Sequence, residues 1–431
     1  QFGLSALYRK SGQDLKARQH YALLVEEYKD KPVGLEAKVK LAEMDFVEGK
    51  QADAERHVQE VLKANPRSSD GLILTGRMAL ARRNGKEAVQ ALRTVLHDQP
   101  ELATVHYLLG QAYQLTGDTN LAKESFERAI VLYPDQVDAK RSLAVLESKN
   151  GRYEQARARL DDLLKQRPDD VTALDMLMTL DLVTKNWPGA ERTLTRLRRV
   201  STGNNPVALL AEGRFYEAQR RLSEASRAYE RATALAPNEP EPLLSLVKVE
   251  VALGQAQESR TRLEALLVSH KDHPFAHGLL GEVLSLSRKY EEAALHYREA
   301  VRLNPKWMTP WLNWATLSLS QKKPDVAVEV LQEGLKANPE SEELYMLLAS
   351  AHSEQGQIDL AMAAYETTLR LNPRNLLAAN NLAVLLVDHK RDPSSLQRAF
   401  ALSRDFERDA PHPFFIDTLG WVRFKMGQQE E

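Results

Sequence analysis

Prolines recur along this chain at a fixed spacing of 34 residues. The prolines that keep this spacing form three runs: Pro32, Pro66, Pro100, Pro134 and Pro168, then Pro240 and Pro274, then Pro305, Pro339 and Pro373. A period of 34 residues is typical of one helix–turn–helix unit, and such a unit is too small to bury its own apolar face. The chain is therefore expected to fold as a stack of similar units and not around one central core.

Residues 103–136 form the clearest copy of the repeat. Leu109 and Tyr113 are four residues apart and share one face of a first helix, while Gly110 lets a second helix approach closely. Gly117 permits the turn between the two helices. The pattern of this copy is carried by Leu109, Gly110, Tyr113, Gly117, Ala122, Phe126, Ala129 and Pro134. At these offsets the chain resembles the tetratricopeptide repeat family.

Small residues keep the same register along the whole chain. Ten of the thirteen close-approach sites in first helices are glycine or alanine: Ser5, Ala42, Gly76, Gly110, Ala144, Met178, Gly213, Val247, Gly281, Ala315, Ala349, Ala383 and Gly420. Eleven of the twelve small sites in second helices are alanine: Ala17, Ala54, Ala88, Ala122, Ala156, Ala190, Ala225, Ser259, Ala293, Ala327, Ala361 and Ala399. The resemblance therefore covers essentially the whole chain.

The resemblance implies an all-α fold, a right-handed superhelical solenoid of about twelve and a half helix–turn–helix repeats. Strand signals are absent from the sequence. The repeat that starts at residue 171 has no closing proline and is followed by Ser201–Asn205, which predicts a hinge. We therefore expect two arrays, residues 1–205 and 206–431. The repeat at 376 gains four residues near 391–395, which predicts a longer turn between its helices.

Charge and composition exclude several classes of protein. The 431 residues carry 58 basic and 60 acidic side chains, so no basic excess exists to hold a phosphate backbone and we expect no nucleic acid partner. The absence of cysteine excludes disulfides and thiolate metal sites. Apolar runs such as Leu382–Val387 are too short to cross a bilayer. Because the chain starts at Gln1 and stops soon after Gly427, we expect a fragment whose last repeat lacks its second helix.

Catalytic signatures are not found in the sequence, so we expect neither an enzyme nor a bound cofactor. There is no phosphate-binding glycine loop, no G-x-S-x-G elbow and no H-E-x-x-H motif. His270, His273 and His277 form the one histidine cluster, and two of them are one helical turn apart. Metal ligation is one interpretation of this cluster. The favoured alternative is a polar loop that runs into a helix, with His277 facing a neighbouring repeat.

Aromatic residues gather in two places. Trp307, Trp311 and Trp314 have the spacing of an aromatic platform, but Trp311 and Trp314 occupy the bulky packing sites of the repeat, so burial in the core is the favoured interpretation for these two. The second group is Phe414, Phe415, Trp421 and Phe424. We expect part of this group to be exposed.

Partner binding is expected on first helices, because first helices line the concave groove in the family that this chain resembles. The candidate groove residues are Arg77, Tyr107, Gln111, Arg141, Arg214, Lys248, Phe275, Leu312, Met346, Asn380 and Asn381. Arg and Tyr are effective interface anchors, although about half of such a list would be solvated groove residues only. A clamp for a C-terminal carboxylate is not expected, because Glu343 and Met346 stand where its Arg and Lys would be.

The segment Asp417–Gly427 is similar to the closing repeats of bacterial tetratricopeptide proteins tied to exopolysaccharide export and envelope protein sorting. That resemblance implies a non-catalytic scaffold for proteins, extended peptides or polymer-export components. It also implies a periplasmic or outer-membrane-anchored protein, often a lipoprotein, with a cytoplasmic location as the alternative. Two other hypotheses remain open: a substrate-recruiting arm of a larger enzyme, such as a glycosyltransferase or a protease, and a module that forms homodimers through its uncapped ends.

Overall fold

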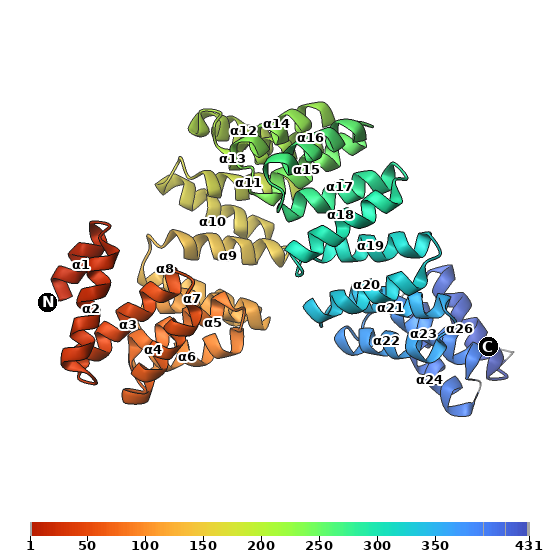
Figure 1. Cartoon of the computed structure of the whole chain (residues 1–431), viewed down its shortest axis with the longest axis horizontal. Coiled ribbons are helices and arrows are strands. Elements are labelled where there is room, and N and C mark those ends of the chain that lie inside the picture. The colour runs from red at the N-terminus through yellow and green to blue at the C-terminus, as the bar shows by residue number, and fades with distance from the viewer. Residues whose placement is uncertain (1, 391, 410, 429–431) are drawn as a thin grey trace. The chain divides into compact units, whose positions relative to one another are not determined.

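The computed structural model describes residues 2–390, 392–409 and 411–428 of the chain, and all its regular structure there is helical (Figure 1). The helices of the first part are α1 (Phe2–Lys10), α2 (Asp14–Tyr28), α3 (Pro32–Val47), α4 (Gln51–Ala64), α5 (Ser69–Ala81), α6 (Gly85–Asp98), α7 (Ala103–Thr116), α8 (Thr119–Leu132), α9 (Val137–Lys149), α10 (Tyr153–Gln166), α11 (Val171–Val183), α12 (Trp187–Ser201) and α13 (Pro206–Ala218).

The remaining helices are α14 (Leu222–Leu235), α15 (Pro240–Ala252), α16 (Ala256–Ser269), α17 (Pro274–Leu286), α18 (Tyr290–Leu303), α19 (Met308–Ser320), α20 (Pro324–Ala337), α21 (Glu342–Glu354), α22 (Ile358–Leu371), α23 (Leu376–His389), α24 (Pro393–Ser403), α25 (Phe406–Asp409) and α26 (Pro413–Lys425). The odd-numbered helices from α1 to α11 and from α15 to α23 each pack against the even-numbered helix that follows. The predicted all-α stack of helix–turn–helix repeats is confirmed.

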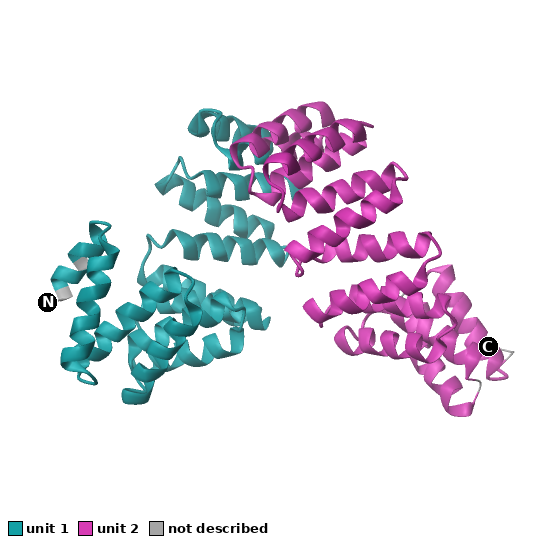
Figure 2. Ribbon diagram, viewed as in Figure 1, with its two compact units in different colours: residues 1–211 teal, residues 212–431 magenta. Residues whose placement is uncertain are grey.

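The chain forms two compact units, residues 1–211 and 212–431 (Figure 2). The division between them falls within α13, and the boundary expected at residue 205 stays a prediction. The outermost ends of the two expected arrays, residues 1 and 431, lie outside the described residues. Each unit is a stack in which a repeat contacts mainly its immediate neighbours.

The small sites are buried as the sequence predicted. All twelve small sites of the second helices, Ala122 among them, are at most 1% exposed. In the first helices the close-approach glycines touch an aromatic or leucine side chain of the following helix. A Cβ added at Gly110 would lie 2.5 Å from the ring of Phe126. Gly420, in the last helix, is the exposed exception, and an added Cβ there would meet nothing within 4 Å.

The turns between paired helices share one backbone conformation. A residue with positive φ follows the first helix in repeat after repeat: Gly49, Arg83, Gly117, Gly151, Lys185, Arg220, Gly254, Arg288, Lys322 and Gly356. Glycine adopts this left-handed conformation without cost, whereas a side chain is strained there. Five of these ten turns nevertheless carry arginine or lysine.

The repeat at 376 differs from its prediction. Here α23 ends at His389 and α24 begins at Pro393, and residue 391, within the stretch where the longer turn was expected, lies outside the described residues. The additional residues instead lengthen the end of α23 and the start of α24. The expectation of a longer turn was wrong because the extra residues continue helices, in which each backbone amide finds a partner.

Buried carboxylates occupy the position equivalent to Tyr113 in four other first helices. The site of Tyr113 is occupied by Asp45, Glu147, Asp181 and Glu250, all at most 3% exposed. Each lies within ion-pair distance of an arginine from a second helix; Glu250, for example, accepts hydrogen bonds from Arg262 at 3.0 Å and from the Ser259 hydroxyl at 2.7 Å. A buried charge is tolerated when it is paired and hydrogen-bonded in this way.

Candidate functional site

First helices of successive repeats lie against one another within each unit. Contacts join α3 to α5 and α5 to α7 in one unit, and α15 to α17, α17 to α19 and α19 to α21 in the other. Second helices make no comparably extensive contact with the second helix of the next repeat within the described parts of the chain. The first helices therefore form the closely spaced, inner side of each stack. We call the face made by Tyr107, Gln111 and their equivalents in other repeats the inner wall.

Three of the cations predicted to bind partners are paired with carboxylates of the same wall. Arg141 on α9 pairs with Asp170, the residue that caps α11. Arg214 on α13 contacts Glu241 on α15 at 3.0 Å, and in return Lys248 on α15 contacts Glu217 on α13 at 2.8 Å. These ion pairs join neighbouring first helices.

Arg77 differs from the other candidate cations on the inner wall. Its side chain is exposed on α5 and makes no ion pair or hydrogen bond among the described residues. The charge it presents to solvent is therefore not neutralised within the stack.

Polar side chains of the wall form a second set of links. The amide of Gln111 donates a hydrogen bond of 2.9 Å to the Tyr107 hydroxyl on the same helix. Asn381 on α23 donates one of 3.1 Å to the hydroxyl of Tyr365 on α22. Asn380 is only 1% exposed, so it lies beneath the wall and not on it. The expectation that Asn380 faces a partner is therefore not met, because its side chain packs into the stack.

The apolar candidates lie on unit 2. Leu312 on α19 and Met346 on α21 are partly exposed. Phe275 on α17 packs against the ring of Trp307, with ring centroids 4.8 Å apart. The same tryptophan covers Gly278, where an added Cβ would lie 2.4 Å from its ring. The ring of Trp307, for which the sequence did not predict burial or exposure, therefore packs over the start of α17.

A hollow of about 360 Å³ opens in the inner wall between α17 and α19. It is lined by Glu282, Ser285, Leu286, Tyr290, Tyr297, Asn313, Thr316, Leu317 and Ser320. Desolvation raises the pKa of the Glu282 carboxyl, which has no ion-pair partner among the described residues. Burial raises the pKa of Tyr297 far above its ordinary value. The hollow therefore offers hydroxyl and amide groups around a carboxyl group that no cation neutralises.

The histidine cluster is engaged in hydrogen bonds. His273 caps α17, because its Nδ1 accepts from the backbone N–H of Ala276 while Nε2 lies 3.2 Å from the carbonyl of Pro237. His277 lies 2.9 Å from His296 on α18. Over the described residues no three His, Cys, Asp or Glu side chains are arranged to hold a metal ion. The cluster lies in a polar loop that runs into a helix, but the expectation that His277 faces a neighbouring repeat was wrong, because it faces His296 on the second helix of its own repeat.

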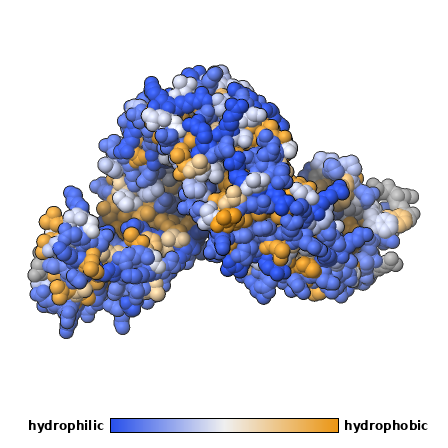
Figure 3. Space-filling model, turned by 45° about the horizontal axis from the view of Figure 1, so that its top comes forward, coloured by the Kyte–Doolittle hydropathy of each residue, from blue (hydrophilic) through white to orange (hydrophobic). Residues whose placement is uncertain are grey.

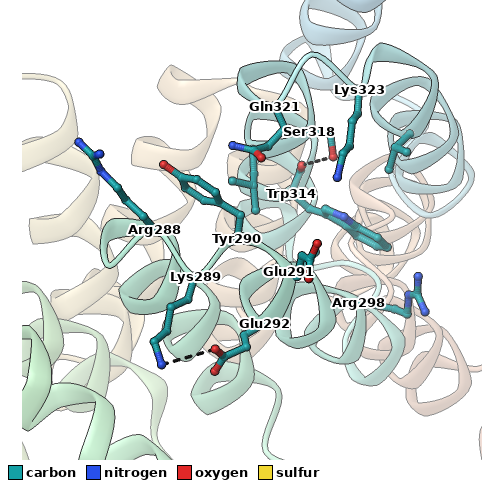
Figure 4. Close-up of a pocket in the computed structure, with 13 residues that line it drawn as sticks. Arg288, Lys289, Tyr290, Glu291, Glu292, Arg298, Trp314, Ser318, Gln321 and Lys323 are labelled. Carbon is teal, nitrogen blue, oxygen red and sulfur yellow. Dashed lines mark hydrogen bonds and ion pairs between the residues drawn. The ribbon is translucent and has the colours of Figure 1, made fainter.

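Second helices leave open hollows between them on the opposite side of the stack from the inner wall. The hollow in Figure 4 has a volume of about 500 Å³ and lies between α18 and α20, with α19 beneath. Its lining comprises Arg288, Lys289, Tyr290, Glu291, Glu292, Ala294, Arg298, Trp314, Leu317, Ser318, Gln321, Lys323 and Val326. A second hollow of about 740 Å³ continues along the same two helices and shares Arg298, Trp314 and Val326 with the first. We call the two hollows together the outer groove.

Trp314 forms the floor that the two hollows share. Its ring stacks on that of Trp311, with centroids 6.5 Å apart and planes 15° from parallel. Trp311 is 7% exposed and donates its indole N–H to the carbonyl of Pro305. The prediction of core burial is therefore correct for Trp311 and met in part for Trp314, which packs against the core but leaves part of its ring uncovered between α18 and α20.

Exposed apolar side chains are otherwise scattered, and Figure 3 shows hydrophobic patches on a mostly hydrophilic surface. The last helix, α26, carries the expected aromatic face. Phe414, Trp421 and Phe424 are between 39% and 52% exposed, while Phe415 packs against Phe406. None of the helices described is both long enough and apolar enough to span a membrane.

Sequence reasoning missed three features of these sites. The buried acids at the Tyr113 site were not singled out, although an acid at a position where other repeats carry Ala79, Leu284 or Leu386 was a usable signal. Glu217 was missed because its partner Lys248 lies in the next repeat. The outer groove was missed because the sequence does not reveal that neighbouring second helices stay apart.

Comparison with protein-family models gives matches along much of the chain. A model described as the cytochrome c-type biogenesis protein H TPR domain matches residues 89–208. Models of the tetratricopeptide repeat match residues 318–386, and residues 46–103, 182–240 and 244–306.

Several curated proteins are similar to the chain. Cellulose synthase operon protein C of Pseudomonas fluorescens is 24% identical over 428 residues, covering 91% of this chain and 33% of that protein. The human protein O-mannosyl-transferase TMTC1 is 24% identical over 192 residues, 44% of this chain and 22% of the relative. A CTR9 homolog of Arabidopsis thaliana is 22% identical and covers 83% of this chain and 30% of the relative. The chain thus spans a third or less of each of these proteins.

Among solved structures, a tetratricopeptide repeat protein of Parabacteroides merdae is 16% identical, with a TM-score of 0.43 over 59% of this chain and 99% of the other. The protein TTC0263 of Thermus thermophilus is 23% identical, with a TM-score of 0.34 over 42% of this chain and 100% of the other. The 34-residue period, the paired helices with buried small sites and the family-model matches lead to one conclusion: the chain belongs to the tetratricopeptide repeat family.

Proposed function

We propose that this chain is an interaction scaffold that binds proteins or extended peptides along its inner walls. The observation that carries the proposal is the contact between successive first helices, which presents side chains from several repeats on one face. An extended partner can then contact one repeat after another, and a few anchors among these contacts supply most of the affinity. The wall contributes binding and not catalysis in this proposal.

The two units offer different chemistry to a partner. In unit 1 Arg77 is exposed without an ion pair, and Tyr107 lies one repeat further along the wall. In unit 2 Leu312 and Met346 are partly exposed, and the hollow that contains Glu282 opens between α17 and α19. Arg141, Arg214 and Lys248 already neutralise carboxylates of the wall. We therefore assign partner contact to Arg77, Tyr107, Leu312 and Met346, and the joining of helices to the three paired cations.

A photo-crosslinking experiment tests which face binds. A photoreactive phenylalanine analogue replaces Arg77 or Leu312 on the inner wall, and in matched controls it replaces Val131 or Leu295, which are 68% and 62% exposed on second helices. In cells of the native host, the inner positions should crosslink to a common set of proteins, and the outer positions should not crosslink to that set. Crosslinks from Val131 and Leu295 alone would contradict the proposal.

The associated process is proposed to be exopolysaccharide export in a bacterial envelope. Support comes from the similarity to cellulose synthase operon protein C, which extends over 91% of this chain. Deleting the gene should lower the amount of secreted polysaccharide. A gene copy with Leu312→Glu and Met346→Glu should fail to restore it, whereas one with Val131→Glu and Leu295→Glu should succeed. Unchanged polysaccharide after deletion would contradict this association.

A second candidate function is a recruiting arm of a larger enzyme. Its support is the similarity to protein O-mannosyl-transferases, in which the matched stretch is 22% of the human relative TMTC1. In that case the polypeptide produced by the native host should carry transferase activity. Variants of the inner wall should then raise the KM for a protein acceptor and leave kcat nearly unchanged.

A further inference from the structure

We propose that the outer groove between α18 and α20 is a second docking site, which binds an acidic peptide segment that places a large apolar or aromatic side chain against Trp314. This site is on the second helices, so it is independent of the inner wall. The argument combines an apolar floor, a set of cations that make no ion pair among the described residues and a groove of limited length.

The floor of the groove is unusually apolar for a solvent-facing surface. Trp314 and Trp311 lie stacked beneath it, and Val301, Val326 and Val330 line its second hollow. Aromatic rings bury a large area with little loss of conformational freedom, which makes them effective anchors. A partner side chain that covered Trp314 would remove its exposed face from water.

The rim of the groove carries an excess of positive charge. The hollow in Figure 4 is lined by four cations and two carboxylates. Lys289 is paired with Glu292 at 3.5 Å. Arg288, Arg298 and Lys323 make no ion pair within the described residues, and the Arg298 guanidinium lies 5.7 Å from the centre of the Trp314 ring. Cations that the chain itself leaves unpaired are complementary to an acidic partner.

The dimensions of the groove match a short extended segment. The second helices that border it have fourteen residues each, so each is about 20 Å long. An extended peptide of about six residues spans that length. A neutral sugar would leave the three cations unused, and a nucleic acid backbone would need a longer row of unpaired cations than the three in this groove. An acidic peptide with one apolar side chain would contact both Trp314 on the floor and the cations on the rim.

The binding test uses the full chain and an array of twelve-residue peptides. Each acidic peptide carries one central phenylalanine, and the comparison peptides replace that phenylalanine by serine or the acids by lysines. Adenosine triphosphate and a cello-oligosaccharide are included as the other ligand classes. Fluorescence anisotropy should give dissociation constants below about 1 mM for acidic peptides with phenylalanine, weakening as salt rises.

Two variants test whether the peptides bind in the outer groove. Arg288→Glu with Lys323→Glu should weaken peptide binding by about tenfold or more. Trp314→Leu, which places the leucine found at residue 109 in this site, should weaken binding of the phenylalanine peptide to the level of its serine counterpart. The matched control is Arg83→Glu with Arg152→Glu, at the equivalent turn positions of unit 1 and likewise without ion pairs among the described residues. This control should bind as the unchanged protein does.

Three results would overturn the proposal. The first is the absence of binding by any acidic phenylalanine peptide below about 1 mM. The second is equal weakening by the groove variant and the control variant, which would indicate attraction by overall charge only. The third is binding of the nucleotide or the sugar that follows the same pattern of variants more strongly than the peptide does. Helicity measured by circular dichroism verifies that each variant is folded.

Discussion

His277 and His296 face each other with their Nδ1 atoms 2.9 Å apart, one on α17 and one on α18. The Nε2 atom of His277 lies 2.9 Å from the carbonyl of Lys271, and since a carbonyl can only accept, this nitrogen carries the proton. In the neutral ring Nδ1 of His277 is then an acceptor for the N–H of His296. The hydrogen bond between the two rings therefore holds a single proton between the Nδ1 atoms.

The first prediction is a loss of stability in mild acid. Burial, and then the nearby His277, lower the pKa of His296 below its ordinary value, while Glu264 and Glu292 act in the opposite direction. In the window between the lowered pKa and the ordinary value of about 6.5, the unfolded chain binds a proton that the folded chain does not. Stability therefore falls as the pH decreases through this window, and levels off below the folded pKa.

Thermal unfolding between about pH 7.5 and pH 5.5 measures this effect. His296→Gln should flatten the dependence of Tm on pH in that range. His389→Gln, an exposed change at the end of α23, is the control and should leave the slope unchanged. Equal slopes for the unchanged protein and His296→Gln would show that the pair does not resist protonation.

The second prediction concerns the contact between paired helices. Gly110→Ala should lower stability by about 1–3 kcal/mol, because the added Cβ would lie 2.5 Å from the buried Phe126 ring. Gly420→Ala is the matched control, since its Cβ would meet nothing within 4 Å. It should raise stability by up to about 1 kcal/mol through helix propensity alone. Urea unfolding followed by circular dichroism compares the two, and a stable Gly110→Ala protein would contradict the close approach.

The third prediction exchanges residues between equivalent turns. Arg83 has φ 58° and Gly117 has φ 82° at the same position of successive repeats. Arg83→Gly should stabilise the chain by about 1 kcal/mol by removing the strain of a side chain in this conformation, and Gly117→Arg should destabilise it by a similar amount. Arg83→Ala removes the charge but keeps the strain, so it should bring no gain. If Arg83→Ala stabilised the chain as much as Arg83→Gly does, the gain in stability would come from removing the charge and not from relieving backbone strain.

The fourth prediction addresses a buried acid. Asp181 is 0% exposed and accepts hydrogen bonds from Arg157, from the Asn186 amide at 2.7 Å and from the Thr193 hydroxyl at 3.3 Å. Asp181→Ala should cost about 3 kcal/mol or more, because it leaves the Arg157 charge without its partner. Asp161→Ala, on the exposed face of α10, should change stability by less than about 0.5 kcal/mol. Similar losses for the two variants would show that the buried pair contributes little.

The fold could be predicted from the sequence because the packing of paired helices favours small residues at positions that are close together in the chain. Gly110 and Ala122 are twelve residues apart, and small residues at both sites let the two helices pack closely, so their recurrence along the chain indicates the fold. The partner of Arg141 could not be found in this way. Asp170 lies 29 residues further along the chain, and only the stacking of one repeat on the next brings the two together.

The exposure of Trp314 was beyond the sequence for a related reason. The equivalent Leu109 also lines a hollow between second helices, yet it is only 6% exposed because its side chain is smaller. Whether α18 and α20 cover Trp314 depends on the spacing between repeats, which results from many small contacts of the first helices. The buried position of Asn380 likewise depends on how closely α23 approaches its neighbours.

Extensive contacts in the described residues join only helices close in chain order, and this has a consequence for how such a chain can change length over evolution. Duplication or deletion of a whole 34-residue unit leaves every remaining pair of neighbours equivalent to before. A single inserted residue inside a helix instead turns each later side chain by about 100° and moves the small sites off the contact face. Variation among descendants should therefore occur in complete units, with single insertions restricted to turns and helix ends.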